Sequence, residues 1–217
     1  MGLFTGYAGW IAGVRDYIGS DEYTDAQIEV FLYLAQKQLN RELKSVWMEK
    51  SMALTITDPT YGAALDLLVN ITDFGKIRLV NVDSSPPLDA SAINELITLM
   101  DEDTSPVTST DDPQTYCIDA GLLYVYPWPA VDAVVNVRYY EEVIPISLTL
   151  ASNTFTDYHE DVLLYAACLA AAVYQVEDER IPIWKSEYER IKEEINNSSG
   201  KIKLGSTPLK RQITGLS

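Results

Sequence analysis

The sequence predicts an α+β fold in which a mainly α-helical bundle carries an inserted antiparallel β region. Apolar residues recur at helical spacing near both ends of the chain, whereas the middle alternates apolar and polar residues as strands do. The 217 residues are 47% hydrophobic, which is enough for one sizeable core. We therefore expect an N-terminal helix pair, residues 1–47, to pack on a C-terminal helix pair, residues 151–200. The β-rich region occupies residues 48–150, and an extended tail, residues 201–217, follows the bundle.

The first two helices are predicted at residues 4–18 and from about residue 25. In the first helix, Trp10 and Val14 recur at helical spacing, although three glycines weaken the pattern. In the second, Thr24 and Gln27 form a capping box at the start. The apolar stripe of this second helix consists of Ile28, Phe31, Leu32, Ala35, Leu39, Leu43 and Val46. The face expected to be solvated carries Glu29, Lys37, Asn40 and Lys44.

The apolar period changes to two after about residue 48, where Met52, Leu54 and Ile56 alternate with small or polar residues. Further strands are predicted over residues 77–82, 115–118, 122–126 and 134–140. An Asp119–Gly121 turn joins the middle pair of these strands as a hairpin. A short helix, residues 90–100, interrupts the strand region.

Two helices are predicted after residue 150. The first has Asp157 as its N-cap with Glu160 three residues later, and its alanines allow a neighbouring helix to approach closely. The second has a narrow apolar seam, which suits packing against a single partner helix. This seam consists of Ile181, Trp184, Tyr188, Ile191 and Ile195. The polar run at residues 196–200 is predicted to end the helix.

The charge of the chain is strongly acidic and unevenly placed. It has 32 acidic and 16 basic residues, hence a formal charge of −16. Binding of DNA through its phosphates requires Lys and Arg, so this composition argues against that mode. Residues 201–217 contain four basic residues and no acid, so residues 1–200 carry −20. A basic tail therefore follows an acidic body.

Cysteine usage and hydropathy favour a chain that folds in a reducing compartment and has no contact with a membrane. Cys117 and Cys168 lack CxxC spacing and companion histidines, so we interpret both as small apolar residues. The N-terminus lacks the pattern of a secretory signal. The longest uncharged run, residues 162–176, is shorter than the roughly 20 residues that span a bilayer.

Residues that could carry chemistry are few. The single histidine, His159, lies among three acidic residues, but acids are expected in a first helical turn, and no nucleophile accompanies them. The acidic runs at 101–103 and 111–112 lack the spacing of a calcium-binding loop. Walker, GxSxG and HExxH motifs do not occur. We expect no catalytic residue, no cofactor and no metal, and instead a binding or assembly role.

Three aromatic residues on predicted strands are candidates for a protein interface, namely Tyr124, Tyr126 and Trp128. Aromatic side chains are enriched at interfaces. On strands they also form core contacts and cross-strand pairs, so both interpretations stay open.

Read in order, several segments are similar to one known family. The opening helices match at Val14–Ile18, Thr24–Ile28 and Ala35–Leu43. The strand region matches at Asp73–Phe74, Ile77–Val82, Pro113–Tyr116, Leu122–Pro127 and Arg138–Tyr140, and the end of the chain at Tyr158–Ala172, Asp178, Trp184 and Tyr188. Over residues 10–195 the chain thus resembles the head-to-tail adaptor (head-completion or connector) proteins of tailed bacteriophages. It departs from them at Thr72, where a proline is usual, and in a longer loop at residues 88–112.

The resemblance implies a structural virion protein of the neck, made in the host cytoplasm. It implies a ring of twelve copies under the portal protein that links the DNA-filled head to the tail and lines the DNA channel. The implied partners are the portal protein, a tail-side nozzle or tail-completion protein, and further copies of this chain, while DNA passes without specific binding. The tail would bind the portal through basic and apolar residues, namely Lys201, Ile202, Lys203, Leu204, Leu209, Lys210, Arg211 and Ile213.

Two other functions are considered beside the adaptor. One is a different neck or tail-completion interaction protein, which the same composition would suit. The other is a small acidic hydrolase that uses His159 with nearby carboxylates.

Overall fold

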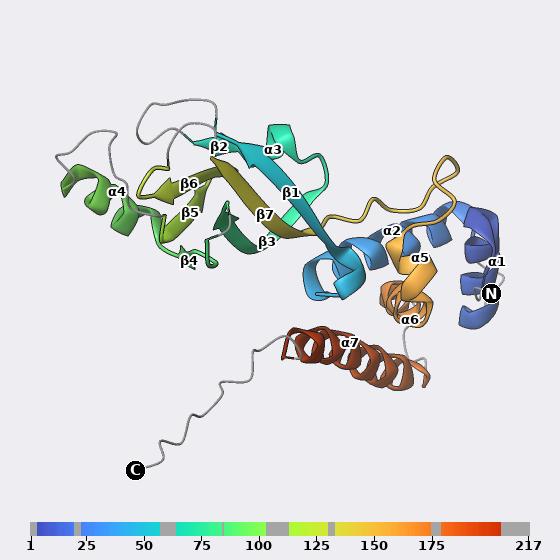
Figure 1. Ribbon diagram of the computed structural model, residues 1–217. Coiled ribbons are helices and arrows are strands. Elements are labelled where there is room, and N and C mark those ends of the chain that lie inside the picture. Colours follow the sequence, from blue (N-terminus) through green and yellow to red (C-terminus); the bar gives the residue numbers. More distant parts are fainter. Residues whose placement is uncertain are drawn as a thin grey trace, which may run out of the picture. The chain divides into compact units, whose positions relative to one another are not determined.

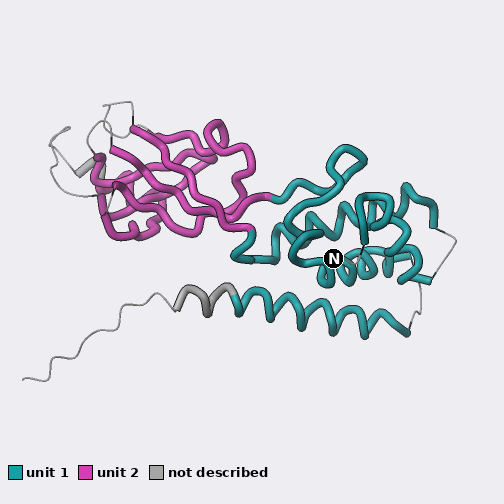
Figure 2. The backbone as a smooth tube through the Cα atoms, turned by 45° about the vertical axis from the view of Figure 1, so that its right-hand side comes forward, with its two compact units in different colours: residues 1–47, 143–217 teal, residues 48–142 magenta. Residues whose placement is uncertain are grey.

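The structure is a computed structural model that describes residues 4–19, 23–56, 64–83, 85–102, 113–129, 133–174 and 179–204. The chain divides into two compact units, Met1–Trp47 with Val143–Ser217 and Met48–Glu142 (Figure 2). We call the first the helical unit and the second the β-rich unit. The predicted α+β fold is confirmed.

The helical unit is built around one helix of small and aliphatic residues. Its helices are α1 (Gly6–Ile18), α2 (Asp25–Glu42), α5 (Thr154–Tyr158), α6 (Glu160–Ala171) and α7 (Ile181–Leu204), with short 3-10 turns at Val46–Met48 (η1) and Ala172–Tyr174 (η2) (Figure 1). Helices α1, α2 and α7 all contact α6. The side chains of Ala166, Ala167 and Cys168 on α6 are fully buried, and their small size lets these neighbours approach closely.

Helix α2 begins at the predicted capping box. The Thr24 backbone N–H donates to Gln27 Oε1 at 2.9 Å, and the Gln27 backbone N–H donates to Thr24 Oγ1 at 3.4 Å. The predicted stripe is buried as far as Leu43. The helix itself ends at Glu42, so the stripe's last residue, Val46, lies in η1.

The predicted start of the first C-terminal helix is wrong. The N-cap is Asn153, whose Oδ1 accepts hydrogen bonds from the backbone N–H groups of Phe155 and Thr156, whereas Asp157 lies inside α5. Asn153 also donates to Gln36 Oε1 at 2.7 Å, which ties the helix start to α2. The helix then breaks at His159 and resumes as α6.

The predicted end of the last helix is also wrong. Helix α7 does not stop in the polar run at 196–200 but continues to Leu204. The predicted seam faces inward, with Trp184, Tyr188 and Ile191 buried against the bundle.

The β-rich unit contains two sheets. The first has the antiparallel order β1-β7-β3, formed by Glu49–Thr55, Val134–Glu141 and Phe74–Val82. The second has the order β2-β6-β5-β4, formed by Leu65–Asp66, Leu122–Tyr126, Thr115–Asp119 and Asp89–Ala90. Two helices, α3 (Leu67–Asn70) and α4 (Ile93–Glu102), complete the unit.

The second sheet both confirms and corrects the predicted strand region. The hairpin between β5 and β6 turns at Ala120 and Gly121, which have φ of 49° and 84°. Glycine suits this left-handed backbone because it has no Cβ to clash. The predicted antiparallel region is confirmed in four of the five strand pairings of the described chain, and the fifth, between the short β4 and β5, is parallel. This pairing also places Ala90 in a strand, so α4 starts three residues later than predicted.

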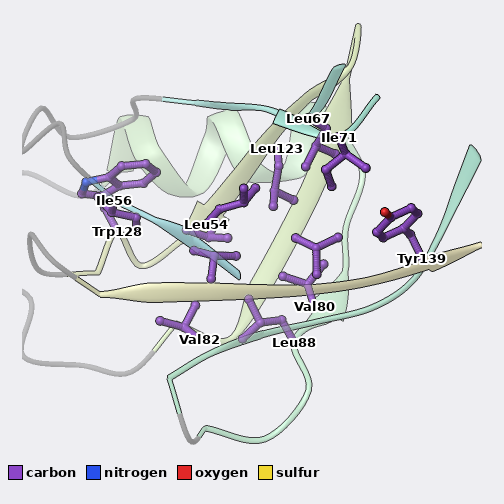
Figure 3. Packing of buried hydrophobic residues seen from close by; sticks show 13 residues of the cluster. Leu54, Ile56, Leu67, Ile71, Val80, Val82, Leu88, Leu123, Trp128 and Tyr139 are labelled. Atoms are coloured by element: carbon purple, nitrogen blue, oxygen red, sulfur yellow. The ribbon is translucent and has the colours of Figure 1, made fainter. Parts of the chain in front are cut away.

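The core of the β-rich unit draws on both sheets. Leu54 of β1 and Val80 of β3 lie in one buried cluster with Leu123 of β6, and Ile71 and Trp128 from the connections join them (Figure 3). The predicted alternation holds at the C-terminal end of β1, where Leu54 and Ile56 are buried and Thr55 between them is exposed. Met52, predicted on the same face as Leu54, is 40% exposed and departs from it.

Candidate interaction surfaces

The single histidine forms a buried pair with a serine. His159 Nε2 lies 2.7 Å from Ser45 Oγ, and the two residues are 6% and 1% exposed. Burial lowers the pKa of His159, because desolvation disfavours the charged imidazolium, and the carboxylate of Asp161 offsets only part of this effect. Ser45 Oγ also accepts from the Trp47 backbone N–H at 3.2 Å. A serine beside a histidine resembles a nucleophile and its base, but this hydroxyl does not face solvent, so the pair serves to join η1 to the α5–α6 break.

The acidic residues do not assemble a metal site in the described part of the chain, where no three His, Cys, Asp or Glu side chains are placed to hold one metal ion. The Asp161 carboxylate accepts from the Val162 backbone N–H at 2.8 Å, as expected at a helix start. Asp101 and Glu102 end α4, and the run at 111–112 lies outside the described residues.

The predicted portal-binding residues are only partly within the described chain. The backbone at residues 201–204 is still helical, so an extended conformation is wrong for Lys201, Ile202, Lys203 and Leu204. Leu209, Lys210, Arg211 and Ile213 lie outside the described residues.

The three candidate interface aromatics differ in exposure. Trp128 is 7% exposed and belongs to the core cluster, so the folded chain offers little of its side chain to a partner. Tyr124 and Tyr126 are half-buried on β6. Their interface role stays a prediction.

A pair of exposed aromatic rings was not predicted. Trp47 and Tyr158 stack with their ring centroids 4.3 Å apart and their planes 4° from parallel. They are 56% and 53% exposed. Each is close in sequence to one member of the buried Ser45–His159 pair, and that bond holds the two backbone segments together.

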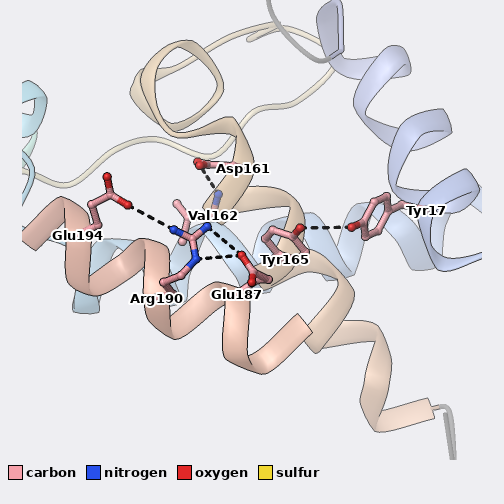
Figure 4. A network of polar contacts seen from close by, with 7 residues as sticks. All are labelled: Tyr17, Asp161, Val162, Tyr165, Glu187, Arg190 and Glu194. Carbon is pink, nitrogen blue, oxygen red and sulfur yellow. Dashed lines mark hydrogen bonds and ion pairs between the residues drawn. The ribbon is translucent and has the colours of Figure 1, made fainter. Parts of the chain in front are cut away.

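A charged surface lies where α7 meets α6 (Figure 4). Arg190 donates to Glu187 at 2.8 Å and to Glu194 at 3.4 Å along the outside of α7. Asp161 of α6 lies on the same side and acts electrostatically on Arg190. We call Asp161, Glu187, Arg190 and Glu194 the acidic face, because three carboxylates surround one guanidinium. Beside it, the Tyr17 and Tyr165 hydroxyls lie 3.3 Å apart, and this contact raises the pKa of Tyr17 to about 12.

A second surface lies on the outside of α2. Val30, Tyr33 and Leu34 are 49%, 51% and 49% exposed, and Lys37 and Arg41 follow on the same side of the helix. We call these five residues the outer stripe. The sequence predicts a solvated, polar face opposite the core. Val30, Tyr33 and Leu34 lie outside the predicted apolar stripe, and this position is the sequence feature that could have revealed the surface.

The exposed apolar and charged surfaces suit a protein that assembles with other proteins. A family model described as SU10 adaptor protein matches residues 5–211, and the chain belongs to this family. It is thus a bacteriophage adaptor, of a structural and not an enzymatic family, whose place is the neck of the virion. No curated protein matches the chain. Among the described residues, no helix has the length and apolar character needed to cross a membrane.

Proposed function

We propose that twelve copies of the chain form a ring under the portal protein, link the DNA-filled head to the tail, and line the channel through which DNA leaves. The observation that carries this proposal is the family match over residues 5–211, which covers both units. The portal protein and a tail-side nozzle or tail-completion protein are the partners on the two sides of the ring.

The charge distribution supports a DNA channel that does not bind its cargo. Residues 1–200 carry a formal charge of −20, so a lumen lined by this part of the chain repels phosphates. DNA held by Lys and Arg would release counterions and bind tightly, which would oppose its passage. The acidic body therefore suits a passage for DNA.

The basic C-terminal residues suit an anchor on the portal. Lys201, Lys203, Lys210 and Arg211 supply four positive charges with no acid among them. A contact that is weak in one copy becomes strong when many copies engage a symmetric partner together. Residues 201–217 of each copy would bind a cleft between two portal subunits.

Electron microscopy of purified portal mixed with the chain tests this function. The expected image shows one added layer directly on the portal ring. A layer that forms only on a portal already carrying another neck protein would instead indicate a tail-completion protein, and would contradict the proposal.

The anchor is tested by deleting residues 205–217, which leaves α7 whole. A second variant replaces Lys201, Lys203, Lys210 and Arg211 with Gln. Both should stay folded by circular dichroism and lose portal binding in sedimentation. The matched control replaces the exposed Lys76 and Lys185 with Gln and should bind normally. If both the truncated chain and the Gln variant dock as well as the full chain, the anchor lies outside residues 201–217.

A further inference from the structure

The outer stripe of α2 has an apolar half and a basic half. Val30, Tyr33 and Leu34 are about half exposed and lie within one turn of one another. One and two turns later come Lys37 and Arg41, and within the described part of the chain Arg41 has no ion-pair partner. Three large apolar side chains gathered on a solvent-facing helix are typical of an interaction site.

The acidic face of α7 has the complementary composition. Ile183, one turn before Glu187 on the same side of the helix, is 61% exposed. Glu187 and Glu194 follow it, with Arg190 between them and paired to both, and with Asp161 of α6 beside them. The helix therefore also presents an apolar residue first and charged residues after it, but with a negative net charge, because three carboxylates outnumber one guanidinium.

The spacing of the two surfaces matches as well. On α2 the apolar and basic groups are centred about seven residues apart, or about 10 Å along the axis. On α7, Ile183 and the midpoint of Glu187 and Glu194 are also separated by about seven residues. Parallel packing with Tyr33 against Ile183 would place Lys37 beside Glu187 and Arg41 one turn before Glu194.

One copy cannot join these surfaces within itself. Both α2 and α7 pack on α6 with their buried sides, Phe31 and Leu32 on one and Trp184 and Tyr188 on the other. The exposed residues of the two surfaces therefore lie outside the buried contacts that α2 and α7 make with α6. A partner must supply the complement.

We propose that the outer stripe of one copy binds the acidic face of the next copy, with α2 and α7 parallel. This rests on the ring of the proposed function and names the surfaces that close it. Because the two surfaces differ, a pair of copies still has one free outer stripe and one free acidic face. Further copies can add through the same contact, and a ring closes if the rotation from one copy to the next divides a full turn evenly. Apolar residues at the centre would supply affinity, and the charges would fix the register.

Charge reversal tests the contact. The variants K37E/R41E and E187K/E194K are compared with the wild type by sedimentation velocity, under the conditions in which the wild type forms rings. Each variant alone should lose the ring species. An equimolar mixture of the two should restore rings, because each variant then meets a neighbour of opposite charge. A single chain with all four substitutions should also restore them.

The matched control, K76E/R138E, makes the same change of charge at exposed positions of the β-rich unit and should assemble normally. Circular dichroism checks that every variant is folded. Loss of the ring in both double variants without recovery in the mixture would overturn the proposed pairing. Unchanged self-assembly with loss of portal binding would also overturn it, because the outer stripe would then face the portal.

Cross-linking tests the same contact without requiring stable rings. Y33C in one copy and I183C in another should form a disulfide-linked dimer under mild oxidation, whereas each alone should not. The natural cysteines, Cys117 and Cys168, are buried and leave little background. L148C serves as control, since Leu148 is 86% exposed on the same unit. Absence of the linked dimer while wild-type rings form would overturn this contact and leave the ring standing; absence of rings altogether would instead refute the proposed function.

Discussion

His159 makes the stability of the protein depend on pH in a range where few other groups titrate. It is the single histidine of the chain, it is buried, and its pKa is lowered below the ordinary value near 6.5 by loss of hydration. The unfolded chain therefore binds a proton more readily than the folded chain as the pH falls through 6.5. The contribution of His159 to the free energy of unfolding is fully present above pH 6.5. It decreases as the pH falls from 6.5 to the lowered pKa of the folded state, and changes no further below that pKa.

We expect the free energy of unfolding in urea to fall between pH 7 and pH 5, by at most about 1.4 kcal/mol per pH unit. The variant His159→Gln keeps a group that can bond Ser45 and should remove this slope. The carboxylates with lowered pKa values, such as Asp73 and Glu42, lose their contribution only at lower pH. A wild-type slope that survives the substitution would show that another group is responsible.

At the scale of elements, the two helix caps of the bundle differ in what depends on them. Thr24 caps α2 through contacts that are local in sequence. Asn153 caps α5 and in addition donates to Gln36 Oε1 and to the Ile144 carbonyl at 2.8 Å. Gln36 is fully buried, and its Oε1 also accepts from the Ile146 backbone N–H at 3.0 Å. The second cap thus holds a connection between α2 and the C-terminal helices.

Thr24→Ala should reduce the free energy of unfolding by about 1 kcal/mol, the usual cost of a lost N-cap. Asn153→Ala should cost about 2–3 kcal/mol, because it also removes a bond to a buried polar group. Thr24→Ser keeps the capping oxygen and serves as the control. Urea unfolding of the three variants measures the difference, and equal losses for the two alanine variants would contradict the wider role of Asn153.

These caps also show what could be predicted from sequence. The capping box of α2 lies within four residues, so the spacing of Thr24 and Gln27 was sufficient to find it. Asn153 and Thr156 form a second local capping box that the prediction of Asp157 overlooks, whereas the bond from Asn153 to Gln36, 117 residues away, leaves no local pattern. For the same reason the parallel pairing of β4 with β5 was missed, since it depends on residues far apart in the chain. The seam of α7 is buried as the spacing predicts, but the helix continues past the polar run at 196–200 that was expected to end it.

The candidate surfaces were harder to predict than the core. Burial of Trp128 follows from the packing of two sheets, which alternation within one strand does not show. The apolar residues of the outer stripe could have been found from the sequence, because their helical spacing places them on the side of α2 opposite the buried stripe. The stacked pair of Trp47 and Tyr158 lies beside the Ser45–His159 bond, which joins residues 114 positions apart, so no local pattern indicates it.

At the scale of the whole molecule, the excess of acid sets its response to DNA. We expect no retention of duplex DNA in a gel-shift assay at physiological salt. Lowering the salt should not produce retention, because weaker screening increases the repulsion between like charges. A protein that binds through phosphates shows the opposite trend. Retention that grows at low salt would contradict the inert channel.

The ends of the β-rich unit lie next to each other. Glu49 at the start of β1 is paired in register with Tyr140 near the end of β7, so the polypeptide leaves the helical unit and returns to it on adjacent antiparallel strands. The β-rich unit is thus a 95-residue insertion in the helical unit, with its entry and exit strands paired to each other. An insertion with adjacent ends can change in length or sequence without changing the path of the helices. Related chains would therefore be able to keep the helical unit while the β-rich unit varies.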